Sequence, residues 1–124
     1  MSQVARRPLV LIVEDDELTR MDAIEMIRAA GFDVLEAADA DAAIALLEER
    51  ADISVVFTDI DMPHSNEGQL LAHAVRRRWP PVKVVATSGH FDMKGFVLPE
   101  GTLFLPKPYV LAMVTRTLYE IVPR

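Results

Sequence analysis

Three short apolar runs constrain the fold of this chain more than any other feature of its sequence. They cover residues 9–13, 55–58 and 82–87, and each is rich in β-branched residues and bounded by charged residues, Pro or Gly. A strand with one solvated face alternates apolar and polar residues, whereas a strand covered on both faces is apolar throughout. The runs therefore predict strands of a parallel sheet with helices on both faces.

Segments with helical periodicity alternate with these runs. Gly31 is a natural stop for the first helix, Asp39 can cap the second, and Pro80 ends the third. Weaker strand signals at 33–36 and 103–105 complete a set of five strands. The helices are expected over residues 17–30, 40–50, 68–79 and 110–122.

The alternation of strands and helices predicts a doubly wound α/β fold with a five-stranded parallel sheet. The stretch 90–101 contains Gly95, Pro99 and Gly101, and it therefore predicts at most a short or irregular helix. A chain of 124 residues has room for one domain, which we expect over residues 9–124 after an N-terminal tail of residues 1–8.

Composition excludes several classes of function. The chain has no cysteine, so disulfides, thiol catalysis and thiolate metal sites are excluded. A net charge of −6 argues against binding to nucleic acid or to an anionic membrane surface. The N-terminus lacks the apolar core of a signal peptide, and no apolar run approaches the ~20 residues of a membrane helix. We therefore expect a cytoplasmic protein.

Polar residues follow the predicted strands, at the edge where a parallel sheet binds its ligands. Acidic residues follow two of the strands, a Thr-Ser-Gly segment ends a third, and a Lys-Pro pair follows the last. Because the carboxyl ends of parallel strands meet at one edge, we expect these side chains to converge. In chain order they are Glu14, Asp15, Asp16, Asp59, Asp61, Thr87, Ser88 and Lys107.

The chemistry of this set favours phosphoryl transfer. Carboxylates a few ångström apart repel one another unless a cation is present. Oxygen ligands without His or Cys select a hard cation, Mg²⁺ or Mn²⁺. Lys107 and Thr87 would clamp an anionic oxygen group such as a phosphoryl group, and a carboxylate would be the nucleophile.

Each residue taken alone has a simpler interpretation, which stays open. Acidic residues at 14–16 also favour the N-terminus of the next helix, and Asp59 also suits a turn. Residues 87–89 are an ordinary turn signal, and a lone lysine at 107 suits a solvated surface. Their occurrence together, at the ends of successive strands, is what favours a functional site.

With these residues in view, the sequence resembles the receiver domain of two-component response regulators over essentially its whole length. The matching segments are LVLIVEDDE, VVFTDIDMP, VVATSG and LFLPKPY. The resemblance implies a flavodoxin-like fold with strand order 2-1-3-4-5. It also implies a stand-alone, single-domain response regulator that acts in phosphorelay signal transduction.

The resemblance gives the acidic residues separate roles. Asp59 matches the aspartate that accepts a phosphoryl group from a histidine kinase or a phosphotransfer protein. Glu14 and Asp15 match the acidic pair that holds Mg²⁺ (or Mn²⁺), and Asp15 is the direct ligand by this match. Asp59 and the backbone carbonyl of Asp61 would complete the metal site.

Further roles fall on residues near the last two strands. Thr87 and Lys107 match the hydroxyl and the ammonium that contact the phosphoryl oxygens. Phe104 occupies the position of the aromatic switch residue and, with Thr87, would carry the signal. The Lys107–Pro108 peptide bond matches one that is usually cis in the family. The span from Thr87 to Lys107 is about two residues shorter than in common members, which puts the signalling face of the family in question.

The implied protein is not an enzyme beyond its own phosphoryl acceptance and dephosphorylation. It would act through contacts with a downstream protein of unknown identity, without nucleic acid or membrane, and as a monomer or a homodimer. Two other interpretations remain: a small haloacid-dehalogenase-like phosphatase that uses Asp59 and Asp61, and a degenerate receiver that is never phosphorylated. Rapid turnover of phosphate esters would favour the phosphatase.

Overall fold

The computed structural model describes residues 7–61, 67–89 and 98–122. Its centre is a sheet of five parallel strands in the order β2-β1-β3-β4-β5, which confirms the predicted fold class. The strands are β1 (Leu9–Val13), β2 (Asp33–Ala37), β3 (Ile53–Asp59), β4 (Lys83–Ser88) and β5 (Leu103–Pro106). The helices are α1 (Glu17–Ala29), α2 (Ala40–Glu49), α3 (Glu67–Arg78) and α4 (Leu111–Ile121).

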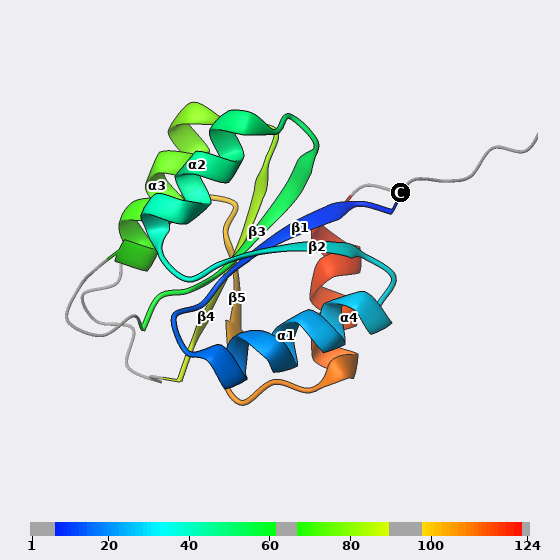
Figure 1. Ribbon diagram of the computed structural model, residues 1–124. Coiled ribbons are helices and arrows are strands. Elements are labelled where there is room, and N and C mark those ends of the chain that lie inside the picture. Colours follow the sequence, from blue (N-terminus) through cyan, green and yellow to red (C-terminus); the bar gives the residue numbers. More distant parts are fainter. Residues whose placement is uncertain (1–6, 62–66, 90–97, 123–124) are drawn as a thin grey trace, which may run out of the picture.

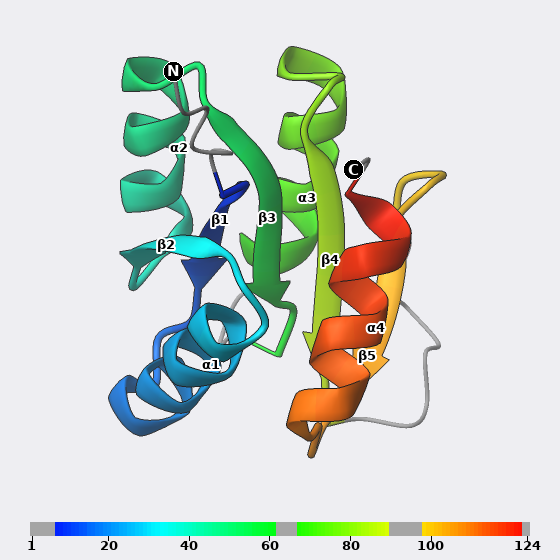
Figure 2. The ribbon, with the colours of Figure 1, turned by 90° about the vertical axis from the view of Figure 1, so that its right-hand side faces the viewer.

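The helices cover both faces of the sheet. Helices α2 and α3 lie on one face, and α1 and α4 lie on the other (Figure 1). The arrowheads of β3, β4 and β5 point to the same end of the sheet in Figure 2, as parallel strands require. The irregular helix predicted within 90–101 falls mostly on residues 90–97, which lie outside the described residues. Within the described ranges, none of the helices is long and apolar enough to span a membrane.

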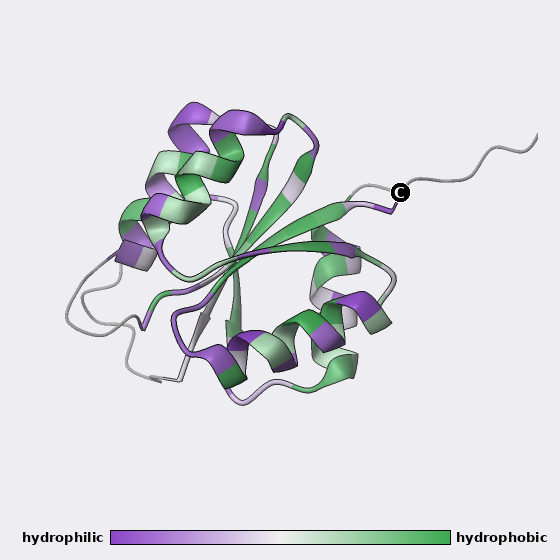
Figure 3. Ribbon diagram, in the orientation of Figure 1, coloured by the Kyte–Doolittle hydropathy of each residue, from purple (hydrophilic) through white to green (hydrophobic). Residues whose placement is uncertain are grey.

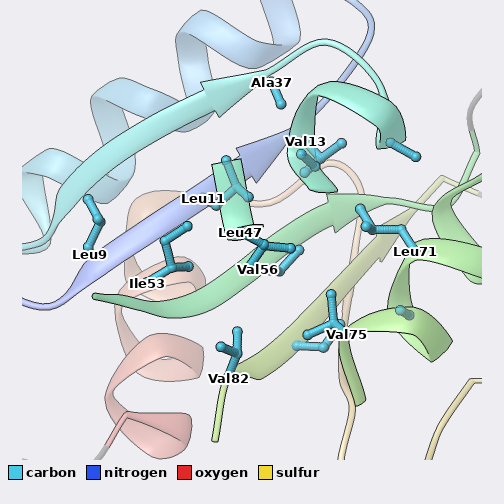
Figure 4. Close-up of a cluster of buried hydrophobic side chains, with 14 residues drawn as sticks. Leu9, Leu11, Val13, Ala37, Leu47, Ile53, Val56, Leu71, Val75 and Val82 are labelled. Atoms are coloured by element: carbon cyan, nitrogen blue, oxygen red, sulfur yellow. The ribbon is translucent and has the colours of Figure 1, made fainter. Parts of the chain in front are cut away.

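The hydrophobic core consists of two layers, one on each side of the sheet. All five residues of β1 are buried, and Figure 3 shows the apolar character of the central strands. Leu11 and Val56 face the layer under α2 and α3, where Leu47 and Leu71 meet them (Figure 4). Val10, Ile27 and Leu118 belong to the layer under α1 and α4, and all three are fully buried. A fully buried aliphatic side chain contributes about 1.5–3 kcal/mol, so both layers stabilise the sheet.

Local signals in the sequence set several element ends. Asp39 caps α2 by accepting a hydrogen bond from the backbone N–H of Ala42 at 2.8 Å, as predicted. Gly31 has φ of +103°, a left-handed conformation that favours glycine after a helix. The Tyr119 hydroxyl donates to the carbonyl of Ala30 at 3.0 Å, so α4 is attached to the end of α1.

Strand β3 differs from its prediction at both ends. It begins at Ile53, earlier than expected, and it includes Asp59. The half-buried Ser54 interrupts the apolar run and so hid the start of the strand. Asp59 pairs in the sheet with Thr87 of β4, and both polar side chains are buried. The strand therefore places the acidic side chain at a fixed point of the sheet edge.

Gly68, in the first turn of α3, lies against the backbone of β3. A Cβ atom built on Gly68 would lie 2.7 Å from the Cα of Ile60 and closer still to the carbonyl oxygen of Asp59. Real Cβ atoms do not approach backbone atoms so closely. Only glycine therefore allows α3 to pack at this depth beside the end of β3.

We expect Gly68→Ala to destabilise the fold by about 1–3 kcal/mol. The new methyl group overpacks the contact with β3, and the free-energy cost of this exceeds the gain in helix propensity from alanine. The free energy of unfolding in urea measures the loss. Gly89→Ala is the matched control, since a Cβ there would lie an ordinary 3.7 Å from Oδ2 of Asp61. Equal stability of the two variants would contradict the close approach.

Candidate functional site

Three carboxylates meet at the carboxyl edge of the sheet. Glu14 directly follows β1, Asp15 comes next, and Asp59 ends β3, which lies beside β1. Each residue offers one carboxylate oxygen, and these oxygens lie within 4.8 Å of one another. Glu14 and Asp59 are buried, whereas Asp15 is exposed. The fold therefore brings together the three acidic side chains that the sequence predicts.

Lys107 joins two of these carboxylates. Its Nζ lies 3.1 Å from Oε1 of Glu14 and 3.1 Å from Oδ2 of Asp59. Its backbone N–H donates to the carbonyl of Ser88 at 2.8 Å, which holds the segment after β5 beside the end of β4. The peptide bond between Lys107 and Pro108 is cis. The predicted ammonium group is thus in direct contact with the predicted carboxylates.

The electrostatics of the cluster follow from burial and from these charges. Burial raises the pKa of Glu14 to about 7; the hydrogen bond from the Asp16 N–H opposes this shift, and the charge of Asp59 adds to it. For Lys107, burial acts to lower the pKa, but the charges of Asp59 and Glu14 outweigh it, so that its pKa lies above the ordinary value. The single ammonium contacts two of the three acidic groups, so the site can accept further positive charge.

Asp61 adopts a different arrangement from the other acidic residues. Its backbone N–H donates to Oδ1 of Asp59 at 2.8 Å. Its own carboxylate accepts hydrogen bonds from the Ser88 hydroxyl and from the Gly89 N–H, each at 2.6 Å. The side chain therefore connects the end of β3 to the end of β4. The predicted role of its backbone carbonyl in metal binding stays a prediction.

The remaining predicted residues lie near the cluster in different ways. Thr87 is buried near the end of β4, directly beside Asp59 in the sheet register. Phe104 of β5 pairs with Ala86 and is 37% exposed. Asp16 stays outside the carboxylate cluster and caps α1 by accepting from the Thr19 N–H at 2.8 Å. The simpler interpretation of the acidic segment is therefore correct for Asp16.

Two residues beside the cluster make contacts that the sequence did not predict. Arg20 of α1 donates from Nη1 to the carbonyl of Glu14 at 2.9 Å. A cation near the N-terminus of a helix is unfavourable for the helix dipole, so the position of Arg20 was a sequence signal that it contacts another part of the fold. Tyr109 packs edge-on against Phe57, with ring centroids 5.7 Å apart, and burial raises its pKa to about 12. Its phenol is therefore neutral.

Solvent reaches the cluster at the exposed Asp15 and beside Lys107. A pocket of about 550 Å³ lies between α1 and the segment that follows β5. Thr19, Asp22 and Met26 line it from α1, and Lys107 and Tyr109 line it from the other side. A group from another molecule can therefore approach the ammonium of Lys107.

Comparisons with known proteins agree with this arrangement. The family model of the response regulator receiver domain matches residues 10–115. The sensor kinase CckA of Brucella abortus is 31% identical over 93% of this chain, and the transcriptional regulatory protein PdtaR of Mycobacterium tuberculosis is 30% identical over 83%. The match spans 12% of the length of CckA and 51% of that of PdtaR.

A solved structure shares the fold. The response regulator receiver protein from Sinorhizobium medicae superposes with a TM-score of 0.81 and 25% identity, over 93% of this chain and 94% of its own. The family match and the fold agree over the same residues, from β1 into α4. The chain belongs to the family of response regulator receiver domains.

Proposed function

We propose that this receiver domain accepts a phosphoryl group on the carboxylate of Asp59, with Mg²⁺ bound at the adjacent carboxylates. The observation that carries the proposal is the contact of Lys107 with both Asp59 and Glu14, at 3.1 Å each. A buried carboxylate held beside a lysine and two further carboxylates is a costly arrangement for stability alone. It suits a site that receives a divalent cation and a phosphoryl group.

The donor set fits Mg²⁺. The ligands available from Glu14, Asp15 and Asp59 are all carboxylate oxygens, and a hard divalent cation prefers such oxygens. Asp15 is exposed and would bind the ion directly, while Asp59 would contribute one oxygen. When bound, Mg²⁺ would supply positive charge that offsets the charge of the phosphoryl oxygens.

The transfer forms one bond and breaks another. An oxygen of the Asp59 carboxylate attacks the phosphorus of a phosphohistidine, and the bond between phosphorus and the imidazole nitrogen breaks. The electron pair stays on that nitrogen, which takes up one proton, and Asp59 becomes an acyl phosphate. Lys107 is placed to follow the negative charge, since its Nζ already contacts Oδ2 of Asp59 at 3.1 Å. Such a charge-assisted contact favours the product.

The signal would pass from the acyl phosphate to β4 and β5. Thr87, beside Asp59 in the sheet, would donate its hydroxyl to a phosphoryl oxygen. Phe104 would then move toward the space that Thr87 leaves, because burial of a partly exposed ring is favourable. A hydrogen bond to a charged group contributes ~1.5–3 kcal/mol, and burial of the ring contributes a similar amount. Together these approach the ~5.5 kcal/mol that a nearly complete switch requires.

The partners follow from this chemistry. The donor is a histidine kinase or a phosphotransfer protein of the cytoplasm, and the output is a contact with a downstream protein. Among the relatives, one is named a sensor kinase and one a transcriptional regulatory protein, so domains similar to this chain occur in more than one type of signalling protein. We propose that the chain catalyses only its own phosphoryl acceptance and dephosphorylation. The family match argues against the phosphatase alternative, and the Asp61 carboxylate already accepts hydrogen bonds from Ser88 and Gly89.

Incubation with Mg²⁺ and a small phosphodonor such as acetyl phosphate is expected to add one acid-labile phosphoryl group to the protein. Mass spectrometry of the intact chain measures the addition. Asp59→Asn should abolish it, because the amide is a poor nucleophile, and chelation of Mg²⁺ should strongly slow it. Asp41→Asn, an exposed position on α2, is the matched control and should be labelled like wild type. Full labelling of Asp59→Asn would contradict the assignment.

The charge of the cluster predicts a pH dependence in the absence of divalent cations. The pKa of Glu14 rises from 4.5 to about 7 on folding, so the folded chain binds more protons than the unfolded chain between these values. Stability must then fall as pH rises through that window, by roughly 1–3 kcal/mol. Urea unfolding in a chelating buffer on both sides of the window measures the slope, and Glu14→Gln should flatten it. If stability falls with pH equally in Glu14→Gln and in wild type, a group other than Glu14 takes up the proton.

Mg²⁺ should reverse this loss. An ion that binds only the folded state adds ~2.7 kcal/mol at a hundredfold excess over its dissociation constant. The melting temperature of wild type should therefore rise with Mg²⁺ near neutral pH, and that of Asp15→Asn should rise much less. If both melting temperatures rise equally, the ion binds at another place.

A further inference from the structure

We propose that Arg20 is a positioning residue for the metal-binding segment, and that Glu36 orients it. This inference rests on the proposed Mg²⁺ site, but it concerns residues outside the carboxylate cluster. Arg20 lies on α1 and Glu36 lies on β2, so the proposal connects both elements to the segment that follows β1.

Arg20 makes two directed contacts from different nitrogen atoms. Its Nη1 donates to the backbone carbonyl of Glu14 at 2.9 Å, and its Nε donates to Oε1 of Glu36, also at 2.9 Å. The Arg20 side chain is only 16% exposed, whereas that of Glu36 is 56% exposed. Because the guanidinium is planar and rigid, fixing one nitrogen fixes the direction of the others. Glu36 therefore aims Arg20 at the carbonyl of Glu14.

The contact completes the set of bonds that hold Glu14. The backbone N–H of Glu14 donates to the carbonyl of Ala37 at 3.1 Å. The carbonyl of Glu14 itself accepts the hydrogen bond from Arg20. Its carboxylate accepts from the Asp16 N–H and from Lys107, each at 3.1 Å. The polar groups of Glu14 are thus all engaged, and the next residue is Asp15. Rotation of the peptide between them would move the Asp15 side chain, and Arg20 opposes that rotation.

The position of Arg20 in its helix supports a role beyond local stability. It is the fourth residue of α1, where a cation opposes the helix dipole. Its ion pair with Glu36 is partly exposed, and such pairs contribute little to folding. The main contribution of Arg20 must therefore come from its hydrogen bond to the carbonyl of Glu14. Partners that orient metal ligands in this way typically change metal affinity by about 10–100-fold when removed.

Charge and position predict opposite results, which makes the proposal testable. Arg20 is a cation near a cation site, so its removal should tighten Mg²⁺ binding if only charge matters. If Arg20 positions the ligand segment, its removal should weaken Mg²⁺ binding instead. The sign of the change in the dissociation constant separates the two.

The experiment is calorimetric titration of Mg²⁺ into the whole chain, at a temperature where urea unfolding shows each variant to be folded. We expect Arg20→Gln to raise the Mg²⁺ dissociation constant about tenfold. Arg20→Lys, which keeps the charge but lacks the planar fork, should recover only part of the affinity. Arg28→Gln, which removes an exposed cation in the last turn of the same helix, is the matched control. It should stay within about twofold of wild type, because eight residues of helix place Arg28 about 12 Å beyond Arg20, more than the ~8 Å Debye length at physiological ionic strength.

A double variant tests the role of Glu36. If Glu36 acts by orienting Arg20, then Glu36→Ala should weaken Mg²⁺ binding in wild type but add nothing to Arg20→Gln. Full additivity of the two changes would overturn that part of the proposal. A non-additive result would thus support the orienting role of Glu36, and an additive result would exclude it.

The outcomes also separate this inference from the proposed function. If wild type and Asp15→Asn bind Mg²⁺ with the same affinity, the proposed metal site is wrong and this inference falls with it. If Asp15→Asn loses affinity while Arg20→Gln binds Mg²⁺ as tightly as wild type or more tightly, the metal site stands and the positioning role of Arg20 is overturned.

Discussion

The rest of the site depends on the double contact of Lys107 with Glu14 and Asp59. Two carboxylates buried at the ends of adjacent strands repel each other, because burial removes most of the screening by solvent. The Lys107 ammonium lies 3.1 Å from each and so makes their burial tolerable. One ammonium cannot balance all three carboxylates, and Asp15 adds to the negative charge. The protein thus keeps an excess of negative charge at one edge of the sheet, and this excess suits the binding of a divalent cation.

The topology explains how residues so far apart in sequence reach one another. In the order β2-β1-β3-β4-β5, two strands separate β1 from β5, with the acidic residue of β3 between them. Parallel strands lie ~4.8 Å apart, so a long side chain at the end of β5 can cross the end of β4. The Lys107 N–H keeps that segment against β4 through Ser88, and the Asp61 carboxylate joins β4 to β3. The site is therefore built on rigid strand ends.

Much of this could be predicted from the sequence, because buried parallel strands leave a plain apolar signal and ligands gather at their ends. The carboxylates and Lys107 were found for this reason, and the capping role of Asp39 followed from its residue type. The early start of β3 was hidden by Ser54. Arg20 and Gly68 were missed because their contacts are tertiary: a carbonyl on another segment for one, and a neighbouring strand backbone for the other.

The excess negative charge around Lys107 suits a cation and a phosphoryl group. A crystal structure with Mg²⁺ and beryllofluoride, which mimics the phosphoryl group, would show whether both bind there. We expect beryllofluoride on Asp59, Mg²⁺ against Asp15 and Asp59, and Lys107 turned from Glu14 to a fluorine atom. A structure that binds beryllofluoride elsewhere, or that keeps Lys107 between Glu14 and Asp59 with no ion beside them at saturating Mg²⁺, would contradict this expectation.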